Sequence, residues 1–392
     1  MFFKNTSRRI IPLPYFWYFW PVTLIALIGF FDSIYLSISH HRNYVDMGHQ
    51  SFCAISRALN CDTVSQSPYS IFLNVPVPVW GILGYGFFLF LLVFALYERA
   101  EKKRVWTLLM IVSLVFSIYS TILAFISSFY IHSYCLMCIL SYAVNLALLF
   151  YAWIIRKRFM CEPVITAVRK DILYLLTFPK TVISVTSIFT ASALVMILLF
   201  PPYWLIDPPE LSQNIPAGVT EEGNPWIGAA EDPELVITEF TDYLCTQCRI
   251  KHFFLRQIVG ENPEKIRLIH RHFPMDHKYN PIVRQPYHEG SGVLALFSIY
   301  ARTQNNFWEA NDLFFQLDKS IRLVNSKNIA EMLDLDHRGL ANSLKNQNIL
   351  YHLQKDIQKG LELGLTGTPG YVINNEVYQG YIPDHLLKKG LE

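Results

Sequence analysis

Six of the seven cysteines in the sequence form three closely spaced pairs. The pairs are Cys53 with Cys61, Cys135 with Cys138, and Cys245 with Cys248. Two cysteines three residues apart at the start of a helix place both sulfur atoms on one face, within reach of a disulfide. The helix N-terminus also favours the reactive thiolate through its dipole and its free N–H groups. The first chemistry that the sequence indicates is therefore thiol–disulfide exchange.

The composition predicts a membrane protein. The 392-residue chain is 52% hydrophobic and only 16% charged, whereas a typical soluble domain carries about 25% charged residues. Five apolar stretches approach or exceed the ~20 residues that span a bilayer. They lie at about residues 15–40, 76–97, 105–131, 135–155 and 181–205. The first is too long for a signal peptide and lacks a clear small-residue cleavage site, so we expect a retained helix.

Lysines and arginines gather before the first span, between the second and third, and between the fourth and fifth. They are Lys4, Arg8, Arg9, Arg99, Lys102, Lys103, Arg104, Arg156, Lys157, Arg158, Arg169, Lys170 and Lys180. Cytoplasmic loops carry such an excess, so we expect a cytoplasmic N-terminus and an extracytoplasmic C-terminal domain. The three cysteine pairs then face an oxidising compartment, where disulfides persist. Cys161 falls in a cytoplasmic loop and is expected to be a free thiol without a role.

The chain is expected to divide into four regions. They are a four-helix membrane domain over residues 1–160, a cytoplasmic loop and fifth membrane helix over 161–206, a linker rich in Pro, Gly and acidic residues over 207–228, and a soluble domain over 229–392.

The soluble domain is expected to be of the α/β class. Its predicted elements are a strand, a CxxC helix, a second strand, a helical insert and a hairpin. Their approximate residues are 235–243, 245–259, 265–273, 287–363 and 370–380. This order is typical of a thioredoxin-like domain.

Within this domain we expect Cys245, nearer the helix end, to be the nucleophile and Cys248 to close the disulfide. A zinc site would need two further ligands, and no second pair suits that role. The segments EFTDYLCTQC, RHFPMDHKYNP and GTPGYVIN resemble thiol oxidases of the DsbA class in the thioredoxin superfamily, from about Glu234 to the C-terminus. The resemblance implies that Thr368–Pro369 is a cis-Pro loop that docks an extended segment of the substrate protein; an ordinary turn proline is the alternative.

The same resemblance bears on the strength of the oxidant. The best-known strong oxidants of the class carry a histidine at the second place between the cysteines, where this chain has Gln247 after Thr246. Because that histidine helps to stabilise the thiolate, the dipeptide predicts a less oxidising domain.

The membrane half resembles the vitamin K epoxide reductase family over roughly residues 16–153. The resemblance is carried by DSIYLSISHH, the C-x7-C spacing of the outer loop, Ser67, VPVPVWGILGY and CLMCILSYAVN. Many bacterial members are fused to a thioredoxin-like domain through a fifth span. The resemblance implies a four-helix bundle around a quinone of the ubiquinone or menaquinone class, with Ser67 and Tyr142 at positions near it. Animal members place an asparagine just before the second span, for which Asn74 is the candidate here.

The resemblance also implies a role for each cysteine of the membrane half. Cys138 would meet the quinone ring, and Cys135 would exchange with the outer loop. Cys61 would relay electrons inward, while Cys53 would face the redox partner.

Two further features of the first span could do chemistry. Asp32 lies inside an apolar run, where burying an unpaired acid is costly. It is a candidate for proton delivery to a quinone, and an interhelical hydrogen bond is the alternative reading. His40, His41 and His49 could suggest a metal, but without a second shell we predict none.

Together these features predict a membrane thiol oxidase in the bacterial cytoplasmic membrane. Electrons would pass from reduced secreted or periplasmic proteins through the three cysteine pairs to the membrane quinone pool, and the net charge of +2 gives no sign of nucleic-acid binding. Two alternatives remain. The same relay could run outward to supply a disulfide reductase or isomerase, or the chain could be a membrane-tethered chaperone with structural disulfides, which resist mild reduction.

Overall fold

The computed structural model describes residues 14–55, 58–96, 104–159, 162–210, 215–317 and 325–389. Cys161 and most of the basic residues expected at the cytoplasmic side before the third span lie outside these ranges. The chain divides into two compact units. The first comprises residues 1–42 and 51–202, and the second comprises residues 43–50 and 203–392.

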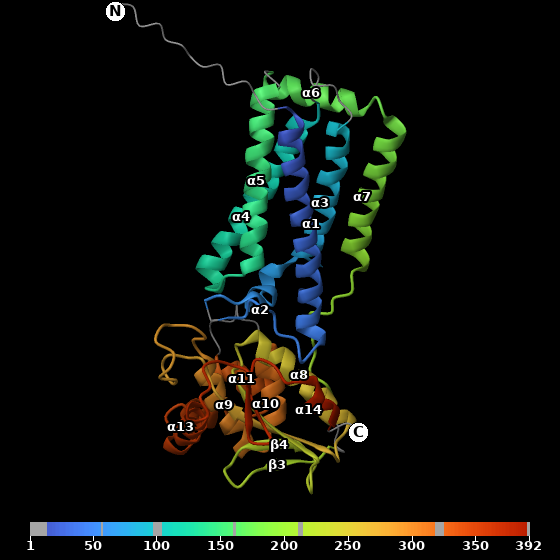
Figure 1. Cartoon of the computed structure of the whole chain (residues 1–392). Helices are drawn as coiled ribbons and strands as arrows, with labels where there is room; N and C mark the ends of the chain where they lie inside the picture. Colours follow the sequence, from blue (N-terminus) through green and yellow to red (C-terminus); the bar gives the residue numbers. More distant parts are fainter. Residues whose placement is uncertain are drawn as a thin grey trace, which may run out of the picture. The chain divides into compact units, whose positions relative to one another are not determined.

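Among the described residues, five helices are long and apolar enough to cross a membrane (Figure 1). They are α1 (Phe16–Val45), α3 (Val77–Leu96), α4 (Trp106–Ile126, extended by the π-helical turn η2, Ser127–Ile131), α5 (Leu136–Phe159) and α7 (Pro179–Leu199). The five predicted spans are therefore confirmed. Short elements of the loop between α1 and α3 are α2 (Cys61–Ser65), η1 (Pro68–Ser70), β1 (Ile71–Phe72) and β2 (Val75–Pro76).

Four of these helices share one core. Phe88 of α3, Trp106 and Leu109 of α4 and Leu148 of α5 are fully buried, and residues of α1 complete the cluster. In contrast, α7 has no buried residue and packs on the bundle through contacts such as that between Phe189 and Phe87. Its apolar side chains stay exposed, as expected of a helix that faces lipid. The first unit is thus a four-helix core with a fifth helix at its side.

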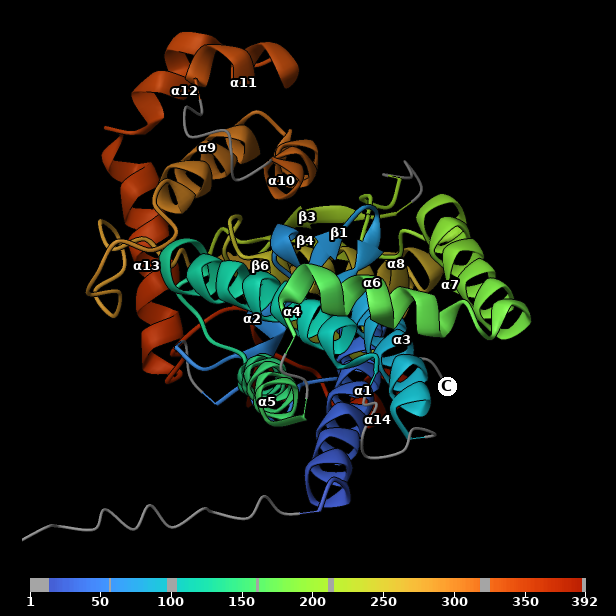
Figure 2. The same ribbon diagram turned by 90° about the horizontal axis from the view of Figure 1, so that it is seen from above.

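A further helix, α6 (Val164–Leu175), lies in the connection between α5 and α7, where we expected a loop. Figures 1 and 2 show it running across the end of the bundle. Asp171 on α6 is buried and accepts the N–H groups of Thr107 (3.0 Å) and Leu108 (3.3 Å). The first N–H groups of a helix have no partner within it, so Asp171 caps α4 from a distant segment.

The second unit contains a six-stranded sheet with the order β3-β4-β6-β5-β7-β8. The strands are β3 (Ala217–Val219), β4 (Pro225–Gly228), β5 (Leu235–Thr241), β6 (Ile266–His272), β7 (Gly370–Ile373) and β8 (Glu376–Gln379). β5 pairs in parallel with β6 and antiparallel with β7. β3 and β4 occupy part of the segment expected to be a linker, because their backbone groups complete the edge of the sheet beside β6.

Helices pack around this sheet, and they include the CxxC helix and the helical insert that the sequence predicts. They are α8 (Thr246–Glu261), α9 (Ser291–Thr303), α10 (Phe307–Gln316), α11 (Ser326–Met332), α12 (His337–Ser343), α13 (Gln347–Glu362) and α14 (Asp384–Lys389). α9 to α13 form the helical insert between β6 and β7. The unit is a thioredoxin-like α/β domain, and Asn374 and Asn375 form the left-handed turn of the expected hairpin.

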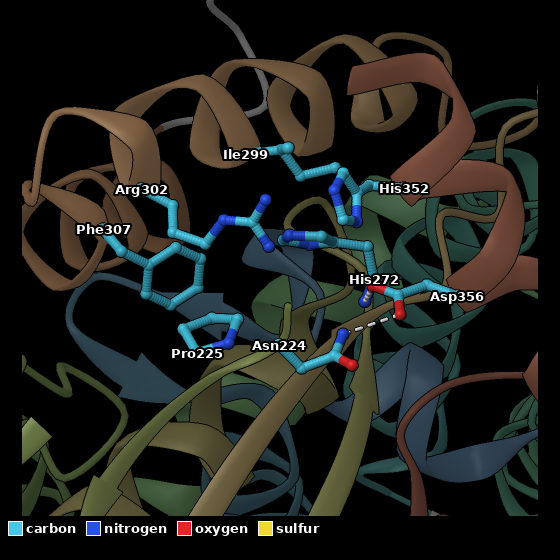
Figure 3. Close-up of a pocket in the computed structure, with 8 residues that line it drawn as sticks. All are labelled: Asn224, Pro225, His272, Ile299, Arg302, Phe307, His352 and Asp356. Atoms are coloured by element: carbon cyan, nitrogen blue, oxygen red, sulfur yellow. Dashed lines mark hydrogen bonds between the residues drawn. The ribbon is translucent and has the colours of Figure 1, made fainter. Parts of the chain in front are cut away.

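A buried aspartate ties the helical insert to the sheet. Asp356 on α13 accepts hydrogen bonds from the Asn224 side chain (2.8 Å), the His272 backbone N–H (3.1 Å) and Arg271 (3.2 Å). Figure 3 shows Asp356, Asn224 and His272 around a small cavity that Arg302 also lines. Burial raises the pKa of Asp356 to about 6, although these donors oppose the shift.

This raised pKa predicts how Asp356 affects stability. A carboxyl group whose pKa is higher in the folded state contributes most below its ordinary pKa, near 3.8, and that contribution is lost as the pH rises through about 6. Between pH 7 and pH 5, the wild-type domain should gain about 1 kcal/mol from this group, and Asp356→Asn should not. Unfolding measured at both pH values checks this, since other titrating groups cancel in the comparison. An equal wild-type-to-variant difference at the two pH values would contradict it.

Candidate redox sites

Four cysteines of the membrane unit meet in one cluster. Cys53, Cys61 and Cys135 are buried together, and Cys138 packs against them with Leu36, Val64 and Met137. Cys53 and Cys61 form a disulfide, whereas Cys135 and Cys138 are free thiols. Thiol–disulfide exchange requires a thiolate to reach a disulfide sulfur, and this cluster brings both kinds of group together.

The outer loop is attached to the segment that leads into α5. The backbone of Tyr134 donates to Ala58 (2.8 Å) and accepts from Asn60 (2.9 Å). Asn60 also caps α2, because its side chain accepts the N–H groups of Asp62 and Thr63. Cys61 is therefore the first residue of a short helix that is fixed beside Cys135.

Cys135 occupies the N-terminal boundary of α5. Its carbonyl oxygen accepts the N–H of Ile139 (3.0 Å), and its sulfur accepts the backbone N–H of Cys138 (3.1 Å). A sulfur that accepts an N–H at a helix start is stabilised as a thiolate. This geometry suits Cys135 to exchange with the loop disulfide.

A cavity of about 480 Å³ opens beside these cysteines within the first unit. Cys61, Cys135 and Cys138 line it, as do Ser67 and Tyr142, the two positions that the sequence placed near a quinone. The remaining lining is mostly aliphatic and aromatic. Cavities of ~300–1,000 Å³ with apolar walls and a few polar groups are typical ligand sites.

Polar side chains deeper in the bundle border the same cavity. Asp32 is buried and accepts a hydrogen bond from Ser141, which lines the cavity. Tyr85 donates to the Asn145 side chain (2.7 Å), which in turn donates to Ser120 (2.8 Å). Tyr85, Asn145 and Ser120 all line the cavity. No role for these three residues was predicted from the sequence.

Asn74, the candidate for the asparagine of the animal enzymes, does not line the cavity. It lies exposed in the turn between β1 and β2, where its φ of 59° fits the left-handed conformation that asparagine tolerates. In this chain, Asn145 is the asparagine at the cavity.

In the soluble unit, the CxxC pair also lies at the start of a helix. Cys245 is the N-cap of α8, its carbonyl accepts the N–H of Arg249 (3.1 Å), and its sulfur accepts the N–H of Cys248 (3.4 Å). Cys248 is fully buried and Cys245 is partly exposed. The Thr368–Pro369 peptide bond is cis, and the carbonyl of Thr368 lies 3.6 Å from the Cys245 sulfur.

These surroundings separate the two thiols electrostatically. A hydrogen bond from Cys248 is the main cause that lowers the pKa of Cys245 to about 6, and it outweighs the opposing effect of burial. Burial raises the pKa of Cys248 well above its ordinary value. These shifts favour a thiolate at Cys245 and a protonated thiol at Cys248.

Asp242 and His288 lie beside this site, and no pattern in the sequence pointed to either residue. The Asp242 carboxylate accepts from the backbone of Leu244 (2.7 Å) and Met275 (2.6 Å) and lies 3.0 Å from Nδ1 of His288. Burial alone would raise the pKa of Asp242, but His288 and the backbone donors hold it below the ordinary value. The pair joins the loop after β6 to the turn that carries Cys245.

One group of buried side chains has the composition of a metal site. The carboxylate of Glu239 lies 2.6 Å from Nδ1 of His252 and 2.9 Å from Nδ1 of His270. Burial would raise the pKa of Glu239, but the two histidines lower it to about 2. The atoms that would bind a metal are thus engaged with one another, as a carboxylate hydrogen-bonded by two imidazoles. His40 lies elsewhere, beside the membrane cavity, with Ser70 at 3.2 Å.

Two family models match the chain. Residues 20–153 match the vitamin K epoxide reductase family, and residues 236–392 match the DSBA-like thioredoxin domain. The chain is also 26% identical over 153 residues to a protein of Salinispora arenicola described as Na(+)/H(+) antiporter NhaA 1. That alignment covers 39% of this chain and only 22% of the antiporter.

Solved structures of thioredoxin-like proteins are similar to part of the chain. A thioredoxin-like oxidoreductase from Silicibacter pomeroyi is 21% identical, with 44% of this chain and 91% of that chain covered and a TM-score of 0.36. The catalytic domain of Proteus mirabilis ScsC is 21% identical (43% and 89% covered, TM-score 0.32). The thiol-disulfide exchange protein α-DsbA2 from Wolbachia pipientis is 17% identical (43% and 85% covered, TM-score 0.33).

The fold and the paired cysteines thus define a membrane-bound thiol–disulfide oxidoreductase. More specifically, the chain is a fusion of a vitamin K epoxide reductase family membrane domain with a DSBA-like thioredoxin domain.

The lowered pKa of Cys245 predicts its reactivity. In the reduced protein, alkylation of Cys245 should reach half of its maximal rate near pH 6, so about 90% of it is thiolate at pH 7. Cys248→Ala should move this midpoint upward, because it removes the main stabilising hydrogen bond. Cys248→Ser retains a donor and should move it less. Mass spectrometry of the peptide that contains Cys245 measures the rates, and equal midpoints in both variants would contradict the assignment.

Proposed function

We propose that the protein is a thiol oxidase that forms disulfides in proteins outside the cytoplasm and passes the electrons through its three cysteine pairs to a quinone. The observation that carries the proposal is the cluster of Cys53, Cys61, Cys135 and Cys138 at the edge of an apolar cavity. A disulfide and two thiols that meet beside such a cavity are arranged for transfer of electrons from protein sulfur to a lipid-soluble acceptor.

The residues around the cavity fit a quinone ring. Its walls are mostly apolar, while Ser67, Tyr142 and Asn145 supply hydroxyl and amide groups that can bind carbonyl oxygens. When bound, a quinone of the ubiquinone or menaquinone class would supply an acceptor for two electrons and two protons. Tyr142 lies one helical turn after Cys138 on α5, so both side chains lie on the same face of the helix.

The relay begins in the soluble domain. A substrate thiolate attacks the Cys245 sulfur of the Cys245–Cys248 disulfide, and Cys248 leaves and takes up a proton. A second substrate thiolate then attacks the mixed disulfide, and Cys245 leaves as a thiolate. The substrate gains a disulfide, while the domain holds two electrons as a thiolate and a thiol. The loop at Thr368 and Pro369 would hold the substrate segment beside Cys245 during these steps.

The later steps reoxidise the domain. The Cys245 thiolate attacks Cys53 in the Cys53–Cys61 disulfide and Cys61 leaves; Cys248 then closes on Cys245 as Cys53 leaves. The Cys61 thiolate attacks Cys135 of a Cys135–Cys138 disulfide and Cys138 leaves; Cys53 then closes on Cys61 as Cys135 leaves. Closure of the Cys135–Cys138 disulfide again releases two electrons and two protons, which a bound quinone would accept. Each step breaks one S–S bond and forms another until this last oxidation.

Orientation in the membrane follows from charge. Arg156, Lys157 and Arg158 end α5, and Arg169 and Lys170 lie on α6. Positive charge is retained on the cytoplasmic side, so this end of the bundle would face the cytoplasm of a bacterium. The cysteine cluster lies at the other end of the bundle, after the end of α1 and at the start of α5. It would then face the extracytoplasmic side, where reduced secreted proteins are available as substrates.

Anaerobic turnover of the purified full-length protein tests the function. The substrate is a reduced dithiol peptide. Oxidation of the peptide should require an added quinone, and one quinone should be reduced for each disulfide that forms. If quinol instead drove reduction of a disulfide peptide at a higher rate, the relay would run outward. If neither reaction occurred while the three pairs resisted mild reductants, the disulfides would be structural.

Two variants should trap the relay. Cys248→Ala leaves no thiol to resolve the mixed disulfide on Cys245, so a Cys245–Cys53 adduct should accumulate. Cys138→Ala should likewise trap Cys61 with Cys135. Non-reducing peptide mapping by mass spectrometry identifies both adducts. If both were absent, and a Cys53→Ala/Cys61→Ala protein still turned over with quinone, the proposed order of exchange would be wrong.

Asp32 is proposed to deliver a proton to the cavity through Ser141. Asp32→Asn keeps the shape and the hydrogen bond but cannot donate an acidic proton, so quinone reduction should slow about tenfold or more. Exchange among Cys245, Cys53 and Cys61 should remain unchanged. Asp171→Asn is the matched control, since Asp171 is a buried aspartate of the same unit that caps α4. A lower melting temperature with unchanged turnover per folded molecule would make Asp32 structural.

A further inference from the structure

The helix α6 exposes a row of large aliphatic side chains. They are Ile165, Ile172, Leu173 and Leu176, the last of which directly follows the helix. Their spacing places them on one side of the helix, and Ile165 is 86% exposed. A contiguous apolar surface of this kind marks a site of contact with a protein or a membrane. The described part of the bundle leaves this aliphatic row uncovered.

The opposite side of α6 fixes the helix at the end of the bundle. Ala167 and Leu175 are buried in the core that the membrane helices share, and Asp171 accepts the N–H groups at the start of α4. Figures 1 and 2 show α6 crossing the bundle at this end. Because α4 is long and apolar enough to cross a membrane and begins at Trp106, α6 lies at the depth where a span begins.

Aromatic side chains mark the same depth as the boundary between membrane and water. Trp17 and Trp20 are exposed in the first turns of α1, and the ring N–H of Trp106 donates to Tyr15, just before α1 (2.8 Å). Tryptophan and tyrosine are enriched at this boundary. The helix that follows α6, α7, begins at Pro179 and has no buried residue, as expected of a lipid-facing span. A lipid bilayer is therefore the partner that fits the aliphatic row.

One unpaired cation lies within the aliphatic row. Arg169 is one turn after Ile165 and one turn before Leu173, and it is exposed. It makes no hydrogen bond or ion pair with any residue of the described ranges, whereas its neighbour Lys170 pairs with Glu162. A long basic side chain can lay its aliphatic stem along an apolar surface while its charge reaches a polar layer. The position of Arg169 suits contact with a lipid phosphate.

We propose that α6 lies in the headgroup layer of the membrane and that Arg169 binds the phosphate of an anionic phospholipid. Ile165, Ile172 and Leu173 would contact the upper part of the acyl chains. Helices with an apolar face and basic residues bind membrane surfaces in this way, and anionic lipids strengthen the binding. Because the other side of α6 holds the start of α4, a lipid bound here should stabilise the bundle. The proposal does not depend on the direction of electron flow or on a quinone.

The first test measures stabilisation by an anionic lipid. The full-length protein is placed in nanodiscs of phosphatidylcholine with an increasing fraction of phosphatidylglycerol, and its melting temperature is followed by tryptophan fluorescence. Arg169→Gln removes the charge, and Arg169→Lys retains it. Lys170→Gln is the matched control, since Lys170 is a cation of the same helix that already pairs with Glu162. Inorganic phosphate, added to nanodiscs of phosphatidylcholine alone, separates a lipid headgroup from a free anion.

Phosphatidylglycerol should raise the melting temperature of the wild-type protein. Arg169→Gln should need about fivefold more of it for half of that rise, which is the effect of about one cationic contact at an anionic surface. Arg169→Lys and Lys170→Gln should stay close to wild type. A wild-type response in Arg169→Gln, an equal loss in Lys170→Gln, or the same rise with inorganic phosphate would overturn the proposed phosphate contact.

A second test measures the lipid contact of the aliphatic row and does not depend on stability. Ile165→p-benzoylphenylalanine places a photoreactive group in the row, and Thr166→p-benzoylphenylalanine places it at the next exposed position, outside the row. After illumination in the mixed nanodiscs, mass spectrometry should find phospholipid adducts mainly at position 165. Equal yields at the two positions, or adducts at position 165 with protein alone, would show that the bilayer does not cover this row.

Discussion

Sulfur exchange requires direct contact, so the membrane site depends on the attachment of the outer loop to the start of α5. That attachment is a short ladder of backbone hydrogen bonds between Ala58, Asn60 and Tyr134. It places Cys61 in the same buried cluster as Cys135 and Cys138. Without it, the loop disulfide would have no fixed position relative to the two thiols.

In the soluble domain, the end of β5 has the corresponding role. Glu239, within that strand, anchors a buried group with His252 and His270, and Asp242, just after it, organises the turn before Cys245. Both acids have lowered pKa values despite burial, because imidazole and N–H donors surround them. The strand therefore carries charge into the interior only where donors compensate for the loss of solvent. The end of β5 therefore places two carboxylates, those of Glu239 and Asp242, in the interior of the domain close to the CxxC helix.

The sequence predicts what is encoded locally. Apolar length gives the five membrane helices, and alternation with turn residues gives β5, β6 and the β7–β8 hairpin. Spacing alone pairs the cysteines. It does not predict β3 and β4, whose short strands form because β6 offers an unpaired edge. Nor does it predict α6, whose place depends on the interaction of Asp171 with the start of α4. The contacts of Asn145 and His288 depend on partners far away in the chain, which no local pattern contains.

The two CxxC pairs share one local geometry in different surroundings. In each, the first cysteine begins a helix and its sulfur accepts the backbone N–H of the second, at 3.1 Å in the membrane unit and 3.4 Å in the soluble unit. This shared arrangement favours a thiolate at Cys135 and at Cys245. The difference lies in what surrounds the pair. Cys138 lines an apolar cavity within the bundle, which suits a lipid-soluble acceptor. Cys245 is partly exposed beside the Thr368–Pro369 loop, which suits an extended peptide. The helix start therefore favours a thiolate in both units, and the surroundings of the two pairs are what differ.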